Sequence, residues 1–160
     1  MSQIKVRFAE EKDMKNLSDL LLSFENYFCE LDHVNKKKVY VTENKLLEMH
    51  FSDNKFMRTF IAEQNGHIVG SISFYRGFLF EDPPCSVLHF PEMFVLPEFR
   101  NTDAVQKLLL SVRALAKKER INKLVFSVYG LNKDVRNHYE KLNAKYFTDE
   151  NEHFMFFDVD

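Results

Sequence analysis

Two side chains in this sequence are suited to proton transfer. Glu92 precedes the run Met-Phe-Val-Leu-Pro, where its carboxylate can take a proton from an ammonium group, and the phenol of Tyr139 can donate one. Tyr139 also continues an apolar helical stripe with Val135 and Leu142, and carboxylates are usually exposed to solvent. Residue types alone therefore favour packing for Tyr139 and leave the role of Glu92 open.

An anion-binding turn is indicated just downstream of Glu92. A strand-like run ends at Arg100 and a helix begins near Asp103; free N–H groups and the positive end of a helix both favour an anion. A phosphate-cradling turn usually contains glycines, which let the backbone approach phosphate closely, but residues 101–106 read Asn-Thr-Asp-Ala-Val-Gln. The sequence therefore predicts a cofactor site with a glycine-poor loop.

Asp103 argues against a diphosphate at this loop. A carboxylate repels a nearby phosphate by an amount that depends on the local dielectric. The alternative is that Asp103 caps the helix that begins at Ala104, since aspartate is among the best N-cap residues. A capping carboxylate would occupy the N–H groups that a phosphate needs, so both interpretations predict weakened binding or a rearranged loop.

Composition limits the classes of protein to consider. The 160 residues fit one domain, 1–160, and 45% hydrophobic with 29% charged residues is typical of a globular chain. The net charge of −2 gives no support to nucleic-acid binding, and no apolar run approaches the roughly 20 residues that span a bilayer. Cys29 and Cys85 do not have the spacing of metal ligands, and the sequence shows no signal-peptide pattern. We therefore expect reduced thiols, no metal and a cytoplasmic location.

Periodicity and turn signals predict the elements that position these groups. Thr42 is a helix N-cap candidate, and Asn65-Gly66 between two strand-like runs predicts a hairpin. Strand–helix–strand order makes segments 86–96 and 124–129 parallel neighbours in a mixed sheet. Strands are predicted at 3–8, 56–63, 67–75, 86–96, 124–129 and 154–159, and helices after residues 8, 42, 102 and 132.

The element order and two segments resemble the GNAT superfamily of acyl-CoA-dependent N-acetyltransferases. The segments are 95–100, Val-Leu-Pro-Glu-Phe-Arg, and Asn132 with 139–144, Tyr-Glu-Lys-Leu-Asn-Ala. Residues 42–48 followed by Phe51, and the aromatic run 74–78, are similar to the diamine (spermidine/spermine) and thialysine acetyltransferase branch. The resemblance spans the whole chain and implies an α/β GNAT (acyl-CoA N-acyltransferase) fold, a mixed sheet with splayed central parallel strands flanked by helices.

The resemblance also implies residues that would hold acetyl-CoA as co-substrate. Strand backbone would bond the pantetheine arm, the pyrophosphate would lie over the turn that begins at Arg100, and Asn132 would orient the helix start and the cofactor. The implied cofactor-binding residues are Met93, Phe94, Val95, Arg100, Asn101, Thr102, Asp103, Ala104, Val105, Gln106 and Asn132.

Two catalytic roles follow from the same resemblance. Tyr139 matches the family's usual general acid, which protonates the CoA thiolate after direct attack by an amine, and its spacing from Asn132 favours this role over packing. In the diamine branch two adjacent acidic residues occupy the strand; Glu92 matches the second, and Pro91 stands where the usual base would be. Glu92 would deprotonate or bind a cationic amine, with His89 as a backup base.

Three functions remain open from the sequence. The first is an N-acetyltransferase for a primary amine of a small molecule, polyamine-like or amino-acid-like, which the branch resemblance and the Phe-rich last strand make a homodimer. The second is a degenerate GNAT-fold protein with weakened or lost CoA binding that serves as a binding or dimerisation module. Its support is that the usual glycines are replaced by Asp103, Val105 and Asn143. The third is a protein N-acetyltransferase, which needs an open peptide groove.

Overall fold

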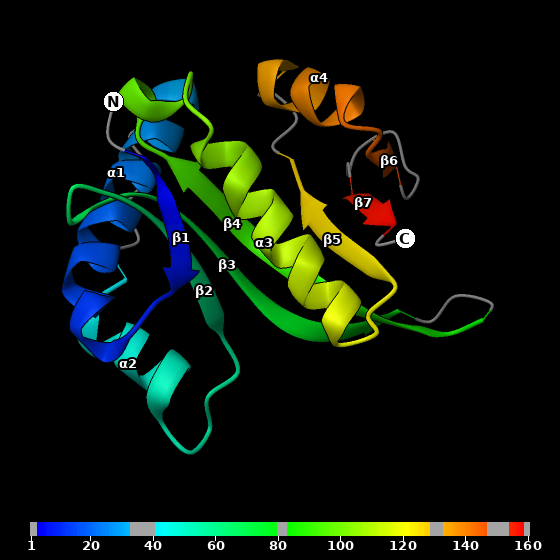
Figure 1. Cartoon of the computed structure of the whole chain (residues 1–160), viewed down its shortest axis with the longest axis horizontal. Helices are drawn as coiled ribbons and strands as arrows, with labels where there is room; N and C mark the ends of the chain where they lie inside the picture. Colours follow the sequence, from blue (N-terminus) through cyan, green and yellow to red (C-terminus); the bar gives the residue numbers. More distant parts are fainter. Residues whose placement is uncertain (1–2, 33–40, 80–82, 129–132, 147–153, 159–160) are drawn as a thin grey trace. The chain divides into compact units, whose positions relative to one another are not determined.

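The computed structural model describes residues 3–32, 41–79, 83–128, 133–146 and 154–158. These form two compact units, whose helices and strands are labelled in Figure 1. Unit 1 comprises Met1–Phe74 and Glu92–Val112, and unit 2 comprises Tyr75–Pro91 and Arg113–Asp160. Across the described residues the strands pair in the order β1-β2-β3-β4-β5-β7-β6. Strands β3 and β4 and helix α3 each run from one unit into the other, so each unit is described separately.

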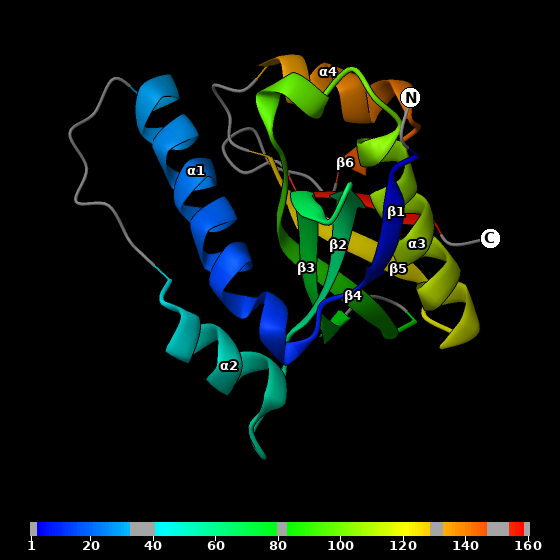
Figure 2. The same ribbon diagram turned by 60° about the vertical axis from the view of Figure 1, so that its left-hand side comes forward.

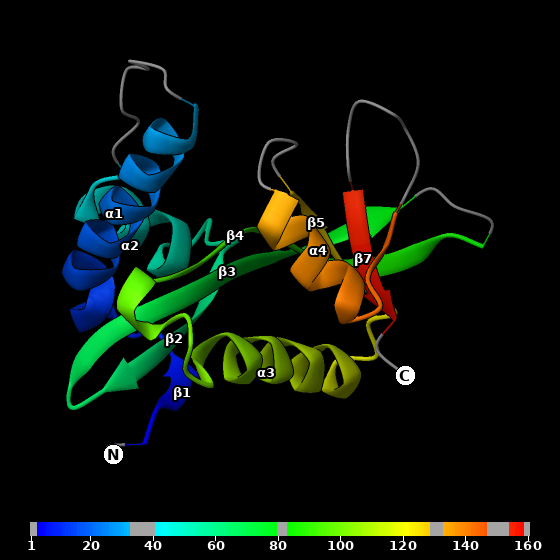
Figure 3. The same ribbon diagram turned by 90° about the horizontal axis from the view of Figure 1, so that it is seen from above.

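Unit 1 contains an antiparallel ladder with helices on both faces. Figure 3 shows α1 and α2 on one face of β2 and β3 and the start of α3 on the other, and Figure 2 shows α1 and α2 side by side. Its elements are β1 (Lys5–Phe8), η1 (Glu11–Asp13), α1 (Met14–Asp32), α2 (Glu43–Phe51), β2 (Arg58–Gln64), the first part of β3 (His67–Leu79), the end of β4 (Cys85–Val95), η2 (Pro97–Phe99) and the first half of α3 (Ala104–Lys118).

Local turn and cap signals formed as predicted in unit 1. Strands β2 and β3 pair antiparallel, and Asn65 and Gly66 between them have φ angles of 52° and 79°, the left-handed conformation that a tight hairpin turn requires. Thr42 caps α2, because its hydroxyl oxygen accepts the N–H of Lys45 at 3.3 Å. Strand β3 extends to Leu79, beyond the predicted end at residue 75.

The core between α1, α2 and the sheet is built from side chains at helical spacing. Met14, Leu17 and Leu20 lie one turn apart on α1 and are buried against Leu46 of α2 and Phe94 of β4. Burying side chains of this size contributes about 1.5–3 kcal/mol each, so this cluster fixes both helices on the sheet.

Strands β3 and β4 approach closely at Gly70. A Cβ atom there would lie 2.8 Å from Val95 Cγ2 and 2.9 Å from the carbonyl oxygen of Phe94. The N–H of Leu96 donates to the carbonyl of Val69 at 2.9 Å, which fixes the antiparallel register of the two strands.

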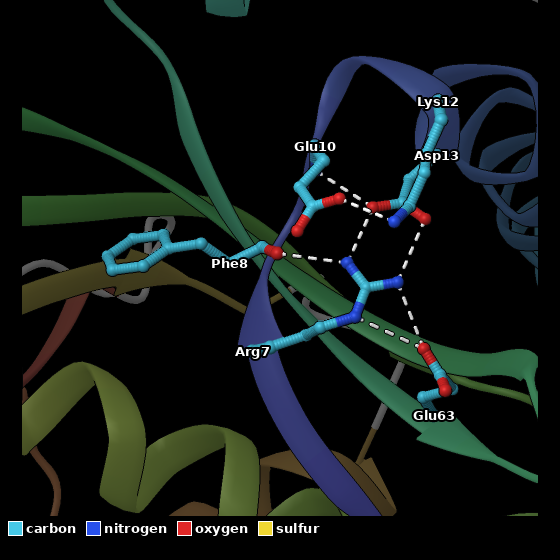
Figure 4. A network of polar contacts seen from close by, with 6 residues as sticks. All are labelled: Arg7, Phe8, Glu10, Lys12, Asp13 and Glu63. Carbon is cyan, nitrogen blue, oxygen red and sulfur yellow. Dashed lines mark hydrogen bonds and ion pairs between the residues drawn. The ribbon is translucent and has the colours of Figure 1, made fainter.

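Arg7 anchors β1 to the start of the first helical segment and to β2 (Figure 4). Its guanidinium donates to both carboxylate oxygens of Asp13, at 2.6 and 3.0 Å, and to Glu63 Oε2 at 2.9 and 3.1 Å. Asp13 also accepts the N–H of Glu10 at 2.8 Å, as in a capping box. These bonds hold the entry to α1 against the edge of the sheet.

Unit 2 contains the parallel pair that the sequence predicted. Val87, Leu88 and His89 of β4 pair in parallel with Lys123, Leu124 and Val125 of β5. The remaining elements of this unit are β5 (Lys123–Ser127), α4 (Lys133–Lys141), β6 (Lys145–Tyr146) and β7 (Phe154–Asp158). Strand β7 pairs antiparallel with β5 and with β6, a short strand that the sequence did not predict.

Helix α4 ends in a Schellman motif centred on Asn143. Asn143 has a φ angle of 62° and donates to the carbonyl of Glu140 at 2.9 Å, and the N–H of Ala144 donates to the carbonyl of Tyr139 at 3.0 Å. Asparagine tolerates this left-handed conformation, so Asn143 fills the position of the expected glycine without a change of backbone. Within the described parts of the chain, no helix is long and apolar enough to cross a membrane.

Candidate active site

Glu92 is the most perturbed carboxyl group of unit 1. Both carboxylate oxygens are buried and have no hydrogen bond of acceptable geometry to any described residue. Burial raises the pKa of Glu92 to about 7, and the backbone N–H of Ser73 only partly opposes that rise. The interpretation of Glu92 as a solvent-facing carboxylate is therefore wrong, since Ser73 and the sheet face remove its oxygens from water.

Glu92 lies opposite Ser73 on the sheet face that α1 and α2 cover. The bond from Leu96 to Val69 and the approach of Ser73 to Glu92 fit one antiparallel register, in which residue numbers increase on one strand as they decrease on the other. Phe94, two residues after Glu92, shares its face and packs into the α1 core. The carboxyl group thus belongs to the helix-covered side of the sheet.

A row of polar side chains continues from Ser73 to α2. The hydroxyls of Ser73 and Thr59 are 2.8 Å apart, Thr59 Oγ1 is 2.8 Å from His50 Nε2, and His50 Nδ1 is 2.8 Å from the carbonyl oxygen of Leu46. All three side chains are buried. Sequence reasoning missed them, because each stands in a different element and none belongs to a recognised motif.

The strand segment 93–95, which was predicted to hold pantetheine, is largely buried and has one backbone group bonded within the protein. Phe94 and Val95 are buried and Met93 is half-buried. The carbonyl of Val95 accepts a hydrogen bond from Nε of Arg100 at 3.2 Å, so one of the predicted backbone groups has a partner within the protein. In the described residues the parallel ladder with β5 ends at His89, before this segment begins.

Arg100 turns back onto the aromatic side chains of unit 1. Its guanidinium carbon lies 4.4 Å from the ring centre of Tyr27 and 5.6 Å from that of Phe94. Cation–π contacts of this kind fix the side chain together with its bond to Val95. Arg100 therefore stabilises the turn after β4.

Asp103 does not cap α3 with its side chain. Its carboxylate pairs with the ammonium of Lys107 at 2.7 Å, and the same ammonium donates to the carbonyl of Ile4 at 2.8 Å. The capping alternative is wrong because Lys107, four residues on, lies on the same face of the helix and attracts the carboxylate. This pairing offsets the negative charge that was expected to repel a diphosphate.

Asp103 holds the N-cap position, since its carbonyl accepts the N–H of Lys107 at 2.9 Å, and the side-chain bonds at the start of α3 come from Thr102 before it. The Thr102 hydroxyl donates to the carbonyl of Phe99 at 2.6 Å and accepts the N–H of Ala104 at 3.3 Å. The N–H groups of Val105 and Gln106 in the first turn are therefore not covered by the Asp103 carboxylate. Among the predicted loop residues Asn101, Thr102, Asp103 and Gln106 are exposed, Val105 is half-buried and Ala104 is buried.

Tyr139 lies in unit 2 and is 5% exposed. Its ring centre is 4.5 Å from that of Phe126, which stacks on Phe90 at 4.5 Å. Burial raises the pKa of the Tyr139 phenol, so the group keeps its proton at all ordinary pH values. Leu142, expected on the same buried stripe, is 40% exposed because α4 ends at Lys141. Asn132 lies outside the described residues, so its position relative to Tyr139 in the structure stays a prediction.

The two histidines near the predicted site have different surroundings. His89 packs against Tyr75 with ring centres 4.9 Å apart; burial lowers its pKa, and its Nδ1 has no partner among the described residues. His138 beside Tyr139 is exposed. No group of three or more His, Cys, Asp or Glu side chains in the described residues is arranged to hold a metal ion.

Comparisons with known proteins give a family profile and a common fold. The profile of the acetyltransferase (GNAT) family matches residues 21–144. No curated protein sequence matches the chain. Among solved structures, the PaiA N-acetyltransferase of Thermoplasma acidophilum in complex with coenzyme A superposes with a TM-score of 0.75 at 17% identity, covering 98% of this chain and 99% of that chain.

Two further solved structures show the range of acceptors served by this fold. An aminoglycoside acetyltransferase from an uncultured soil metagenomic sample, in complex with trehalose, has a TM-score of 0.69 at 15% identity and covers 92% of this chain and 91% of its own. The ribosomal-protein-alanine N-acetyltransferase of Brucella melitensis biovar Abortus 2308 has a TM-score of 0.69 at 17% identity, covering 92% and 95%. At these identities the likeness concerns the fold alone.

Proposed function

The chain belongs to the acetyltransferase (GNAT) family, and on that premise we propose that it transfers the acetyl group of acetyl-CoA to a primary amine of a small molecule. The buried carboxyl of Glu92, with its pKa raised to about 7, carries this proposal. A general base works best when its pKa lies near the working pH, because it is then both available and basic enough to take a proton.

In the proposed reaction Glu92 accepts a proton from the acceptor ammonium. The free amine attacks the thioester carbonyl carbon, the C–S bond breaks, and the CoA thiolate leaves. Tyr139, which burial keeps protonated, donates its phenolic proton to that thiolate, and the nitrogen of the new amide returns its surplus proton to the phenolate.

The start of α3 supports binding of the diphosphate of acetyl-CoA. The positive end of a helix and its first N–H groups attract an anion, and Asp103 is held by Lys107 instead of covering those groups. This contact removes the main objection that the glycine-poor loop raised, and it favours an active enzyme over a degenerate binding module.

We place the acceptor among polyamine-like or amino-acid-like amines, as in the diamine branch that the chain resembles. The aromatic rings around Phe94 do not add to this choice, because the Arg100 guanidinium already lies over Tyr27 and Phe94. The proposal includes a homodimer and a cytoplasmic location, in keeping with the branch resemblance and with cysteines that form no disulfide.

Thermal unfolding with acetyl-CoA tests the cofactor. A ligand at about 100 times its dissociation constant adds about 2.7 kcal/mol to stability, so we expect a clear rise in melting temperature. No shift at millimolar acetyl-CoA would defeat the enzyme proposal and favour the degenerate alternative. Protein acetylation would instead appear as turnover on peptides and none on an amine panel.

Tyr139→Phe tests the acid role. We expect turnover, followed by thiol release across the amine panel, to fall by about 10²–10⁴ while the acetyl-CoA shift remains. The matched control is Tyr75→Phe, which removes a hydroxyl from another tyrosine of unit 2 and should leave turnover near the wild-type value. Unchanged turnover in Tyr139→Phe would remove Tyr139 from the mechanism.

A further inference from the structure

A buried polar row crosses unit 1 from α2 to β4, and we define it as His50, Thr59, Ser73 and Glu92. Its first three members are joined by consecutive 2.8 Å contacts, and the register of β3 and β4 sets Ser73 opposite Glu92. Such a row fills the space between three strands and a helix with groups that require hydrogen-bond partners. The direction of each bond therefore has consequences for its neighbours.

The direction of the bonds is fixed from the His50 end. A carbonyl oxygen only accepts, so His50 Nδ1, 2.8 Å from the carbonyl of Leu46, carries a proton. Burial lowers the pKa of His50, which keeps the ring neutral and leaves Nε2 as an acceptor. Thr59 must then donate to Nε2, and Ser73 must donate to Thr59. Both hydroxyl protons point toward His50 and away from Glu92.

This direction determines what Glu92 meets. With its proton committed to Thr59, the Ser73 hydroxyl has only lone pairs left for the carboxyl group, which suit a protonated acid and oppose a carboxylate. If His50 gains a second proton, Nε2–H donates to Thr59, Thr59 donates to Ser73, and Ser73 donates to the carboxylate. The row thus has two self-consistent arrangements, one for each protonation state of its two ends.

We propose that His50, acting through Thr59 and Ser73, controls the protonation of Glu92 by fixing the direction of the Ser73 hydroxyl. While the Ser73 proton is directed to Thr59, it does not stabilise the Glu92 carboxylate. Release of that hydroxyl favours the carboxylate. His50 is a positioning residue; the catalytic meaning of the coupling rests on the proposed function, whereas the coupling itself exists in the resting protein.

Charged neighbours do not account for the state of either end. The titratable groups on the surrounding elements of unit 1 are Glu11, Lys12 and Asp13 of η1, Lys15, Asp19, Glu25, Tyr27, Cys29 and Glu30 of α1, Glu43, Lys45 and Glu48 of α2, Arg58 and Glu63 of β2, His67 of β3, and Arg100 after β4. Burial and the Leu46 carbonyl set the pKa of His50, and burial and Ser73 set that of Glu92, with no charged side chain contributing.

The wild-type protein provides the first test. Nitrogen-15 NMR distinguishes the two neutral tautomers of histidine, and we expect His50 to carry its proton on Nδ1 at pH 6, where Glu92 is mainly protonated. A proton on Nε2 at that pH would overturn the proposal, because Thr59 would then be the acceptor and the remaining bonds would reverse.

Two substitutions test the coupling from different positions. His50→Phe removes the acceptor of the Thr59 proton, and Thr59→Val removes the acceptor of the Ser73 proton. In both variants the Ser73 hydroxyl is released to donate to Glu92, so the Glu92 pKa, read by carbon-13 NMR of the carboxyl group, should fall by about one pH unit. Ser71→Ala is the matched control, since Ser71 is a fully buried serine two residues from Ser73 and outside the row. The control should leave that pKa unchanged.

A double variant separates the row from general repacking. In a Ser73→Ala background the link is broken, so adding His50→Phe should move the Glu92 pKa no further. An unchanged Glu92 pKa in His50→Phe and Thr59→Val, or an equal shift in Ser71→Ala, would overturn the coupling. If the pKa moves as expected but Glu92→Gln keeps full turnover, the coupling stands and the proposed role of Glu92 as base fails.

Discussion

Two carboxyl groups of unit 1 are removed from water in opposite ways. Asp13 accepts bonds of 2.6 and 3.0 Å from Arg7, and this pairing holds its pKa below the usual range. Glu92 has buried oxygens and no cationic partner in the described residues, and its pKa rises to about 7. A carboxylate buried with its partner joins elements together, whereas one buried without a partner becomes a group that titrates near neutral pH.

The two carboxyl groups serve stability and chemistry separately. The bonds of Asp13 and Glu63 to Arg7 secure the entry to α1, and nothing in that network is left to react. The polar row leaves its last member without a good bond, which is the kind of incomplete satisfaction found at functional sites.

Replacing the unpaired carboxyl should have the largest effect on activity. Glu92→Gln keeps the size of the side chain but cannot take a proton, so we expect kcat/KM for the amine to fall by about 10²–10⁴. Thiol release at saturating acetyl-CoA measures this, and Glu98→Gln, at an exposed position of η2, is the matched control. Equal turnover in both variants would contradict the base role.

The same substitution should stabilise the protein in alkali. Because the folded-state pKa of Glu92 is raised from 4.5 to about 7, the stability linked to its proton is complete below pH 4.5 and is lost as pH rises through 7. Glu92→Gln avoids that loss, so we expect it to exceed the wild type by about 3 kcal/mol at pH 8 and by about 1 kcal/mol at pH 5. Urea unfolding at the two pH values measures the gain; a pH-independent difference would contradict it.

Removing the paired carboxylate should have a smaller effect of opposite sign. Asp13→Asn loses the ion pair with Arg7, whose side chain is 34% exposed, so we expect a loss of about 2 kcal/mol at pH 7. The Asp13 pKa is lowered, so its contribution is present above the ordinary pKa and lost as pH falls through the folded-state value. The difference between variant and wild type in urea unfolding should therefore shrink in acid.

Lys12→Ala is the control for that experiment. Lys12 pairs with Glu10 at an exposed position of the same segment, and its removal should leave the urea midpoint unchanged. The turnover of Asp13→Asn should also follow the wild-type pH profile, because Asp13 makes no contact with the polar row among the described residues. A shifted profile would mean that the two carboxyl groups are coupled.

The sequence predicted the features that depend on neighbouring residues. The Asn65-Gly66 turn, the Thr42 cap and the parallel order of β4 and β5 follow from short-range signals and were confirmed. The ion pair of Asp103 with Lys107, in place of a capping carboxylate, could also have been predicted from the sequence, because residues four apart share a helix face.

The burial of Glu92 depends on residues far away in the sequence. Ser73 stands opposite it on β3, and Thr59 of β2 and His50 of α2 complete the row. Residue types at these positions do not reveal such pairing, since each serine, threonine or histidine has many acceptable partners until the register of the strands is known.

If Gly70 and Gly66 were each randomised in a library of variants, different residues would be tolerated at the two positions. At Gly70 a methyl group would meet the Phe94 carbonyl oxygen at 2.9 Å, and backbone atoms cannot move aside, so selection for folded protein should return glycine alone. At Gly66 nothing lies within 4 Å, but φ is +79°, so asparagine and aspartate should survive while branched residues are lost. Codon counts after one round of selection would thus distinguish a steric limit from a conformational one.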